Sequence, residues 1–382
     1  MKIVFLCGSL EEGRDGVGDY TRKLAMEMVK NGHQATAIAL FDVHIATKFV
    51  GFQELDGHQL MVLRIPSKCG ARERFAYAQS WINEESPKWI SLQYVPFSFH
   101  KRGLHWHLSD FLLALGTGRS WHIMFHELWV GMEKSSPLKL IFWGWAQQLL
   151  IKSLVTSLKP QVIHTQSRLY QLQLLSMGFK ARVLPLFSNI GSLCRKLTGK
   201  MPDTKGLSRK LTMVFFGSIY PDALAKDFSR EVAEYQQIHN IEITLKFIGR
   251  CGPEQQRWAK HWQLNGLKTE ILGELPAQNI SEELSKADIG LTTTPLALVE
   301  KSGTVAAMWQ HGLPVISVAK PWLARGGVKS ELPEGVVEYK AGNLINCLSS
   351  TINKVLANNV IDVASQLEED LFGSSVTTIE NV

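Results

Sequence analysis

The sequence predicts an α/β protein made of two successive domains, each built on a doubly wound parallel sheet. Short apolar runs, which suit strands buried on both faces, alternate with stretches of helical periodicity in both halves of the 382-residue chain. Between residues 188 and 210 this alternation lapses into a segment rich in Gly, Ser and Lys, which indicates a linker. The length allows two or three domains. We place domains at 1–190 and 205–340, followed by a helical tail at 341–382.

The first domain opens with a strand, a glycine-rich turn and a helix. The apolar run 3–7 precedes Gly16 and Gly18, and apolar residues then recur every four positions from Asp19 onward. Asp19 is placed to cap this helix, which we expect to end at 31–32. Glycines at such a turn let a ligand approach the backbone, and a helix start favours an anion. The alternative is a surface turn without a ligand. The spacing is not that of a dinucleotide-binding fingerprint.

The remaining elements continue the same alternation. In the first domain we expect strands at 35–40, 60–65, 89–93, 122–126, 162–164 and 181–184, and helices at 72–84, 105–115, 137–158 and 167–177. In the second we expect strands at 211–217, 241–249, 269–273, 287–294 and 313–318, and helices at 254–265, 281–286 and 303–311. Ligands of open α/β sheets bind at the carboxyl ends of the strands, so the residues that follow each strand are the site candidates.

Composition narrows the class of protein and its partners. With 45% hydrophobic and 20% charged residues the chain is typical of a soluble globular protein. Residues 1–190 hold 21 Lys and Arg against 14 Asp and Glu, whereas the remainder is nearly balanced. A basic first half suits an anionic small molecule or an anionic membrane surface, or is simply a basic surface. No basic run with interleaved aromatic residues appears, which argues against nucleic acid.

The cysteines and the most apolar segment indicate in which compartment the protein is located and whether the chain spans a membrane. The five cysteines are widely spaced and form no CxxC pair, so we expect a reduced, cytoplasmic protein. The apolar segment 138–158 carries Lys139 and Lys152, which favours a buried or interfacial helix over a membrane span. Trp143 and Trp145 would suit a membrane interface, but we expect their rings to lie in the core.

Six segments resemble, in the same order, those of glycosyltransferases with the GT-B fold, near the large retaining family 4. They are GVGDYTRKLA…NGH, LQYVPF, MFHELWVG, FIGRCGP, SKADIGLTTTP and KSGTVAAMWQHGLPVIS, within about the first 320 residues. The resemblance implies two Rossmann-like domains that face a cleft, with a C-terminal helix that returns to the first domain. It also implies a nucleotide-sugar donor, a UDP- or GDP-hexose, held mainly by the second domain. The acceptor, a small or lipid-linked molecule, would be held mainly by the first.

Residues of the first domain then take candidate roles. His126 ends the strand at 122–126, where a histidine can hydrogen-bond a sugar or a phosphate, and Glu127 can orient it or support positive charge on the sugar ring. We take these two as the catalytic candidates, with a structural histidine as the alternative for His126. His164 closes another strand and is expected to be structural.

The acceptor and sugar contacts are expected on two loops of the first domain. Gly16 and Gly18 would bring backbone amides to the donor's phosphates or to the transferred sugar. Asp19 either caps its helix or contacts a sugar hydroxyl. Gln93 and Tyr94 close the strand at 89–93 and are expected to line the acceptor side of the cleft.

The turn at 300–304 carries most of the donor-site prediction. Ser302, Gly303 and Thr304 open a helix whose free N–H groups suit a diphosphate, and Lys301 adds a positive charge. Such a turn would stabilise the departing nucleotide diphosphate, on which negative charge builds in the transition state. An ordinary capped helix is the alternative.

The sequence departs from the family pattern around this turn. The family has two glutamates eight residues apart: Glu300 lies one place from the first, and Ala307 occupies the second, which usually binds ribose. The usual Arg and Lys after the first strand of this domain are missing. Ser218 and Lys226 are the nearest substitutes, and Arg250 would compensate. The base is expected at the loop around Gly273 and Leu275, through main-chain contacts.

Metal chemistry has little support in the sequence. His100, His105 and His107 are closely spaced, but no matched carboxylate accompanies them. No Asp-x-Asp motif occurs, so we expect no metal and no other cofactor. The main hypothesis is a metal-independent hexosyltransferase, with retention implied by resemblance only. A GT-B-shaped scaffold or regulatory subunit without donor binding, and a nucleotide-sugar epimerase, are the alternatives. A nicotinamide oxidoreductase fits least.

Overall fold

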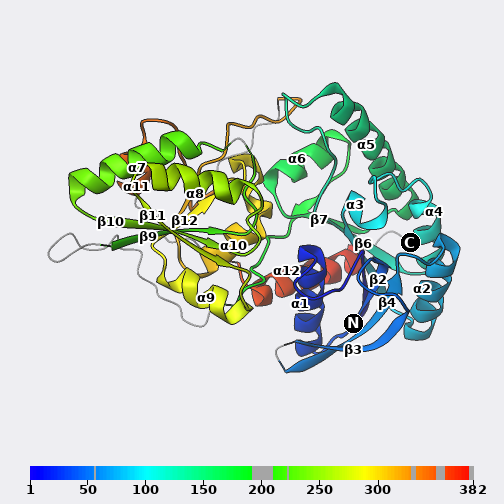
Figure 1. The fold of residues 1–382 in the computed structure, drawn as a ribbon. Coiled ribbons are helices and arrows are strands. Elements are labelled where there is room, and N and C mark those ends of the chain that lie inside the picture. The colour runs from blue at the N-terminus through cyan, green and yellow to red at the C-terminus, as the bar shows by residue number, and fades with distance from the viewer. Residues whose placement is uncertain (56, 192–209, 222, 328–332, 350–357, 378–382) are drawn as a thin grey trace. The chain divides into compact units, whose positions relative to one another are not determined.

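The computed structural model describes residues 1–55, 57–191, 210–221, 223–327, 333–349 and 358–377. The chain forms two compact units, each with its own sheet (Figure 1). The first comprises Met1–Pro185, Ala324–Lys329 and Val360–Val382, and the second comprises Leu186–Leu323 and Ser330–Asn359. Most of the expected linker, and the part of the tail around 350–357, lie outside the described residues.

The sheet of the first unit has the strand order β3-β4-β2-β1-β5-β6-β7-β8. Its strands are β1 (Lys2–Cys7), β2 (Gln34–Asp42), β3 (Phe49–Leu55), β4 (His58–Pro66), β5 (Trp89–Tyr94), β6 (Ser120–Phe125), β7 (Val162–Thr165) and β8 (Arg182–Val183). All neighbours pair in parallel except β3, which runs antiparallel to β4 at the edge. The sequence did not predict β3, because its residues alternate between exposed and half-buried instead of forming a buried apolar run.

Helices pack against this sheet and against one another. They are α1 (Gly16–Lys30), α2 (Ala71–Glu85), α3 (Pro96–Phe99), α4 (Leu108–Leu115), α5 (Leu138–Leu158), α6 (Arg168–Ser176) and α12 (Val360–Thr377). The expectation that Asp19 caps α1 was wrong. Asp15 caps it, and its carboxylate accepts hydrogen bonds from the backbone N–H groups of Val17 at 2.9 Å and Gly18 at 3.3 Å. The helix therefore begins three residues earlier than the apolar pattern indicates.

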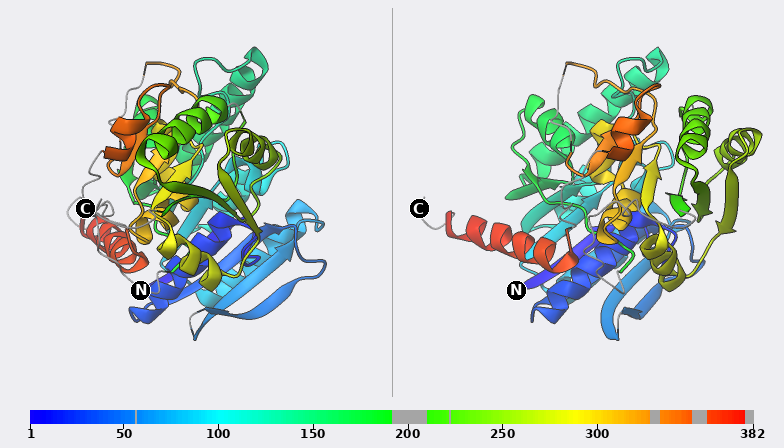
Figure 2. Two further views of the ribbon diagram at one scale, coloured as in Figure 1. Left: turned by 60° about the vertical axis from the view of Figure 1, so that its left-hand side comes forward. Right: turned by 90° about the vertical axis from the view of Figure 1, so that its left-hand side faces the viewer.

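The last helix, α12, belongs to the first unit although the chain reaches it only after the second. It packs against α1, and Figure 2 shows the two helices side by side. Val363, Ala364, Leu367 and Leu371 of α12 are each at most 2% exposed. At its polar face Glu368 accepts a hydrogen bond from Asn31, the residue directly after α1, at 2.8 Å. The C-terminal segment is thus part of the first unit's core.

Helix α5 presents an unexpected surface. Leu138, Phe142, Trp145 and Leu149 are 73%, 70%, 59% and 43% exposed. Their spacing places them on one face of the helix. Trp143 is half-buried, and its indole N–H donates to the backbone oxygen of Arg102. The expectation that both tryptophan rings lie in the core was therefore wrong, since the helix turns an apolar stripe toward solvent.

The second unit has a six-stranded sheet with the order β11-β10-β9-β12-β13-β14, in which all neighbouring pairs are parallel. Its strands are β9 (Lys210–Phe216), β10 (Glu242–Ile248), β11 (Lys268–Gly273), β12 (Ile289–Thr292), β13 (Val315–Ser317) and β14 (Val336–Glu338). Its helices are α7 (Ala225–His239), α8 (Glu254–Leu264), α9 (Ala277–Lys286), the 3₁₀ turn η1 (Leu296–Lys301), α10 (Gly303–Gln310) and α11 (Leu344–Ser349).

Two separate hydrophobic clusters sandwich this second sheet. One contains Phe228 of α7 and Trp258 of α8, and the other contains Leu284 of α9 and Met308 of α10. Helices therefore cover both faces, which confirms the predicted doubly wound α/β class. None of the helices in the described part of the chain combines the length and the apolar composition that a membrane span requires.

Candidate functional site

Three glycine turns lie side by side at the carboxyl edge of the second unit's sheet. Gly217, Gly249 and Gly273 end or follow β9, β10 and β11, with φ of 79°, 84° and 66°. The N–H of Gly249 donates to the Gly273 carbonyl at 2.6 Å, and that of Gly217 donates to Ile248 at 2.9 Å. Glycine adopts these left-handed conformations without the penalty that other residues incur. The turns therefore form a continuous rim of backbone close to the sheet.

Helix α10 begins against this rim. A Cβ atom added to Gly217 would lie 2.7 Å from Thr304 Cγ2, so the turn after β9 touches the first turn of α10. Ser302 caps the helix: its Oγ accepts from the N–H of Val305 and hydrogen-bonds Thr304 Oγ1 at 3.1 Å. Gly303 is exposed. The predicted helix start at 302–304 is confirmed, and it offers solvent-accessible small residues beside a glycine turn.

The predicted cations around this helix start have different surroundings. Lys301 and Glu300 end the η1 turn directly before the cap and are half-buried. Arg250 follows Gly249, and its Nε lies 3.1 Å from a carboxylate oxygen of Glu274, which follows Gly273. Lys226 is exposed in the first turn of α7. Lys301 is thus the cation adjacent in sequence to the cap, whereas the charge of Arg250 is offset by Glu274.

Other predicted donor residues line or border the same edge. Ser218 is exposed and directly follows Gly217. Leu275 is partly buried against the cluster beneath α9 and α10. Ala307, the position that the resemblance assigns to a ribose-binding glutamate, is 1% exposed inside that same cluster. The side chain of Ala307 does not reach the surface.

In the first unit His126 lies directly after β6, between β5 and α1. Its ring is 4% exposed, and Nε2 is 2.8 Å from Gln93 Oε1. The Tyr20 ring of α1 stands edge-on to it, with ring centroids 4.9 Å apart. The backbone N–H of His126 donates to the Tyr94 carbonyl at 3.0 Å. Glu127 follows and is half-buried. The structure thus brings together His126 and Gln93, two of the predicted residues.

The acceptor contacts expected of Gln93 and Tyr94 do not agree with their burial. Both side chains are 0% exposed. The Tyr94 hydroxyl hydrogen-bonds His105 Nε2 at 2.7 Å inside the core, and Gln93 is engaged with His126. Neither presents a polar atom to an acceptor, so we assign them no acceptor contact. Gln93 instead orients the ring of His126.

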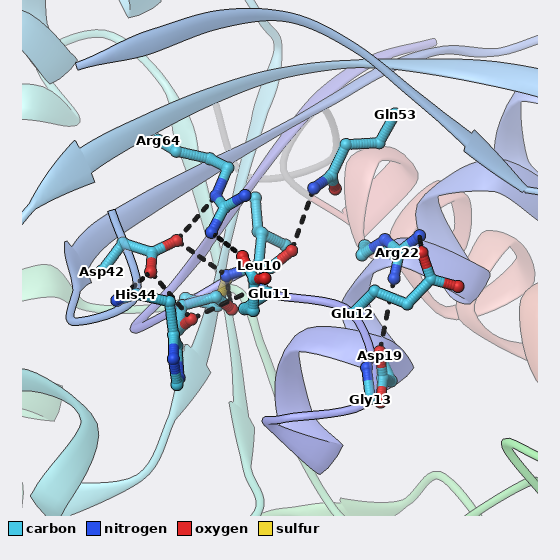
Figure 3. Close-up of polar contacts among 12 residues, drawn as sticks. Leu10, Glu11, Glu12, Gly13, Asp19, Arg22, Asp42, His44, Gln53 and Arg64 are labelled. Carbon is cyan, nitrogen blue, oxygen red and sulfur yellow. Dashed lines mark hydrogen bonds and ion pairs between the residues drawn. The ribbon is translucent and has the colours of Figure 1, made fainter. Parts of the chain in front are cut away.

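The glycine-rich loop after β1 is held by a buried ion pair that sequence reasoning missed (Figure 3). The carboxylate of Asp42 accepts from Arg64 Nε at 2.8 Å and from backbone N–H groups of Leu10 at 3.3 Å and His44 at 3.0 Å. Arg64 also pairs with Glu11. Burial by itself would raise the pKa of Asp42, but the bonds from Arg64 and the backbone hold it below its usual value. The loop is therefore anchored to β2 and β4.

Asp19 and Gly18 also help to hold the glycine-rich loop after β1 in place. Asp19 accepts from the N–H of Gly13 at 3.1 Å and from Arg22 at 3.3 Å, and burial raises its pKa (Figure 3). A Cβ atom on Gly18 would lie 2.5 Å from the Ser9 carbonyl oxygen, so close packing requires glycine there. At Gly16 nothing lies within 4 Å of such an atom. The amide of Gly18 is bound by Asp15, which differs from the expectation that it faces a ligand.

The three histidines considered as metal ligands are separately engaged. His100 Nδ1 accepts from the backbone of Arg102 and Leu104. Burial lowers the pKa of His105 to about 4, and its Nε2 bonds Tyr94. His107 is exposed near Asp110. Among the described residues, no group of three or more His, Cys, Asp or Glu side chains is arranged to hold a metal ion.

Comparisons with known proteins identify the fold. No family model and no curated protein sequence matches the chain. Among solved structures, HepE of Anabaena in complex with UDP and glucose is 15% identical, with a TM-score of 0.56 over 100% of both chains. A glycosyltransferase from Rickettsia africae is 10% identical, with a TM-score of 0.58 over 97% of each chain.

A third solved structure, a Listeria monocytogenes protein assigned as a UDP-N-acetylglucosamine 2-epimerase, is 12% identical. Its TM-score is 0.53, over 97% of this chain and 96% of that one. The similarity to HepE extends over the whole length of the chain. The chain therefore has the GT-B fold, with two Rossmann-like units.

Proposed function

We propose that the protein is a glycosyltransferase that moves a hexose from a UDP- or GDP-sugar to a small or lipid-linked acceptor. The observation that carries the proposal is the start of α10 beside the Gly217 turn, at the carboxyl edge of the second sheet. A helix start presents N–H groups with no partner inside the helix and favours negative charge. The similarity of the chain to HepE in complex with UDP and glucose, and to the Rickettsia glycosyltransferase, supports this proposal.

In this proposal the diphosphate is held by Lys301, Ser302, Gly303 and Thr304. Stabilisation by these groups grows as the glycosyl–phosphate bond breaks, because the departing diphosphate gains negative charge. Ser218, Lys226, Arg250 and Glu300 would contribute to the phosphates and ribose, and main-chain groups at Gly273 and Leu275 would contact the base. Ala307 offers no ribose contact, so the ribose would be bound differently from family 4.

In the first unit, His126 would hydrogen-bond the transferred sugar and Glu127 would support the positive charge that develops on its ring. The main chain at Gly16 and the carboxylate of Asp19 would border the sugar or the acceptor, while Gly18 serves the packing of the loop. Attack by the acceptor from the face that the diphosphate leaves would retain configuration. This stereochemistry rests on the resemblance to family 4.

A lipid-linked acceptor is supported by the exposed stripe of α5. Leu138, Phe142, Trp145 and Leu149 form its apolar face, and the helix carries Lys139 and Lys152 but no acidic residue. Exposed aromatic and basic side chains on one helix suit the surface of an anionic membrane. We therefore include peripheral membrane contact through α5 in the proposal. The proposal also includes a reduced, cytoplasmic location, because the cysteines are widely spaced and form no CxxC pair.

The first test is calorimetric titration of the full chain with UDP, GDP and ADP. We expect one of them to bind, and Lys301→Ala to weaken it about tenfold or more, since a hydrogen bond to a charged group contributes ~1.5–3 kcal/mol. Lys268→Ala is the matched control, because Lys268 is the first residue of β11 and lies at the amino end of the strand, away from the carboxyl edge of the sheet. Equal effects of the two substitutions would remove the diphosphate role of the α10 start.

Two observations favour other functions, and product analysis separates them. The buried Ala307 favours a scaffold that has lost donor binding, which predicts no heat with any nucleotide. The Listeria structure favours an epimerase, which predicts an altered sugar without an acceptor. Mass spectrometry after incubation with mixed sugar nucleotides and cell extract distinguishes transfer from both. A glycosylated acceptor that disappears in Lys301→Ala supports the transferase.

A further inference from the structure

Buried polar side chains cross the middle of the first unit's sheet, and the proposed function does not use them. Ser91 of β5, His122 of β6 and His164 of β7 are each 0% exposed. Ser91 stands directly opposite His122 in the parallel register of β5 and β6. Burying such groups costs free energy unless each finds a hydrogen-bond partner. Here they find one another.

The first part of this chain of hydrogen bonds starts at the candidate catalytic histidine. His126 Nε2 lies 2.8 Å from Gln93 Oε1. Gln93 Nε2 donates to Ser91 Oγ at 2.7 Å. Ser91 Oγ lies 2.8 Å from His122 Nδ1. These contacts run along β5 and then cross to the centre of β6, away from the carboxyl edge.

The second part leads from β6 to the C-terminal helix. His122 Nε2 lies 3.0 Å from His164 Nδ1, and His164 Nε2 lies 2.8 Å from an Asp370 carboxylate oxygen. The other oxygen of Asp370 pairs with Arg182. Asp370 belongs to α12, 206 residues beyond His164 in sequence. Five hydrogen bonds therefore connect α12 with His126.

The chemistry of the groups gives these bonds a direction. The hydrogen bond from His164 holds the pKa of Asp370 below its usual value, so the carboxylate is ionised and only accepts. His164 Nε2 therefore carries a proton. A His164 ring whose single proton is on Nε2 accepts at Nδ1 from His122 Nε2. Burial, assisted by His164 and His126, lowers the pKa of His122 well below its usual value, so the ring of His122 is neutral.

The same reasoning continues to the other end. With its proton on Nε2, His122 accepts from the Ser91 hydroxyl at Nδ1. Ser91 Oγ then accepts from the Gln93 amide nitrogen, and the Gln93 oxygen accepts from His126 Nε2. Every donor points toward Asp370, an arrangement in which neighbouring bonds polarise and strengthen one another.

We propose that Asp370 is a positioning residue that sets the direction of this chain and so places the proton of His126 on Nε2, leaving Nδ1 as its basic nitrogen. Without the carboxylate, His164 can carry its proton on Nδ1 and donate to His122. His122 then donates to Ser91, Ser91 to a flipped Gln93, and Gln93 to His126 Nε2. The proton of His126 moves to Nδ1. The consequence for catalysis rests on the proposed function, whereas the tautomer does not.

The test is ¹⁵N NMR of the full chain with labelled histidine, since protonated and unprotonated ring nitrogens have well-separated shifts. We expect His122, His126 and His164 to carry their protons on Nε2 and to move them to Nδ1 in Asp370→Ala. The control is Glu368→Ala, which removes another contact of α12, to Asn31 at 2.8 Å, and lies outside the chain. We expect it to change none of the three tautomers. A proton on Nδ1 of His126 in the wild type would overturn the proposal.

A second variant keeps the proposal testable if Asp370→Ala detaches α12. Ser91→Ala breaks the chain inside β5 and leaves the contacts of α12 intact. We expect His122 and His164 to keep Nε2 protonated, while His126 shows a mixture of tautomers. An unchanged His126 would contradict the proposal. If transfer activity is found, both variants should lower kcat about tenfold or more without raising the donor KM. Altered tautomers with no activity in the wild type would leave this inference standing and remove only the proposed function.

Discussion

Removing Asp42 should destabilise the first unit more than any surface charge does, because its carboxylate is the centre of a buried cluster. It is 0% exposed and accepts from Arg64 and from the backbone of Leu10 and His44. Asp42→Ala leaves a guanidinium that is 9% exposed with Glu11 as its remaining carboxylate. It also leaves the buried N–H of Leu10 and the part-buried N–H of His44 without that acceptor. Breaking one partner of a buried pair costs about 3–5 kcal/mol.

Urea unfolding followed by hydrogen exchange of peptides from each unit measures this loss where it occurs. Peptides of β1, β2 and β4 should lose protection, and those of the second unit should not. Asp227→Ala is the control, since Asp227 pairs with Arg230 at 3.8 Å on the surface of α7. An exposed pair contributes below about 1 kcal/mol. A loss in Asp42→Ala no greater than in the control would refute the reasoning.

A double-mutant cycle tests whether the charge pair itself causes the loss. Arg64→Met alone leaves a buried carboxylate, whereas Asp42→Ala with Arg64→Met removes both charges. We expect the double variant to lose less than the sum of the single ones, with a coupling of about 1–3 kcal/mol. Additive losses would show that packing, and not the ion pair, anchors the loop.

The same pair predicts a pH dependence. The pKa of Asp42 is lower in the folded protein than in an unfolded chain, where it is about 3.9. Its contribution to stability is therefore complete above that value and is lost as the pH falls through the folded pKa. Wild-type protection in β1 and β2 should fall below about pH 4, and Asp42→Ala should lack this component. Identical acid profiles of the two proteins would contradict the prediction.

Two further predictions concern the second sheet's edge and α5. Gly217→Ala places a Cβ atom 2.7 Å from Thr304 Cγ2 at a φ of 79°, so calorimetry should show weaker nucleotide binding. Gly252→Ala, with a φ of 74° and nothing within 4 Å, should leave binding unchanged, and equal losses would exclude a specific role of the contact. Replacing Phe142 and Trp145 by Ser should reduce sedimentation with anionic vesicles, with neutral vesicles as the reference. Unaltered sedimentation would remove α5 from the membrane proposal.

Local signals in the sequence were sufficient for most of the fold. The runs at β1, β5 and β6 are buried on both faces, so apolarity alone marks them as strands. Ser302 marks the start of α10, because a cap hydroxyl acts on an N–H group only three residues away. The strand β3 was not predicted, because this edge strand has no continuous apolar run. The Asp56-Gly57 pair after it is nevertheless a hairpin signal.

The difference between local and long-range contacts also explains why the wrong aspartate was predicted to cap α1. Asp15 and Asp19 are both suitable caps by residue type, and each lies next to a glycine. The choice depends on how the loop from Ser9 to Asp15 leaves β1. That path is fixed by the close approach of Gly18 to the Ser9 carbonyl and by Asp42, 27 residues beyond the cap. A local pattern cannot select between two aspartates whose roles are set by contacts with another strand.

The candidate site also contains both kinds of residue: those that a local pattern identifies and those whose surroundings depend on distant contacts. The glycine turns follow strands directly, and the start of α10 follows the η1 turn after β12. The rule that loops at the carboxyl ends of parallel strands carry function is enough to find them. The surroundings of His126 depend instead on polar residues in the middle of buried strands and on Asp370, more than 200 residues away. The sequence holds one sign of this: Ser91, His122 and His164 interrupt runs that are otherwise apolar. A polar residue inside a strand buried on both faces must have a partner on a neighbouring element, so each such interruption is itself a prediction of a long-range contact.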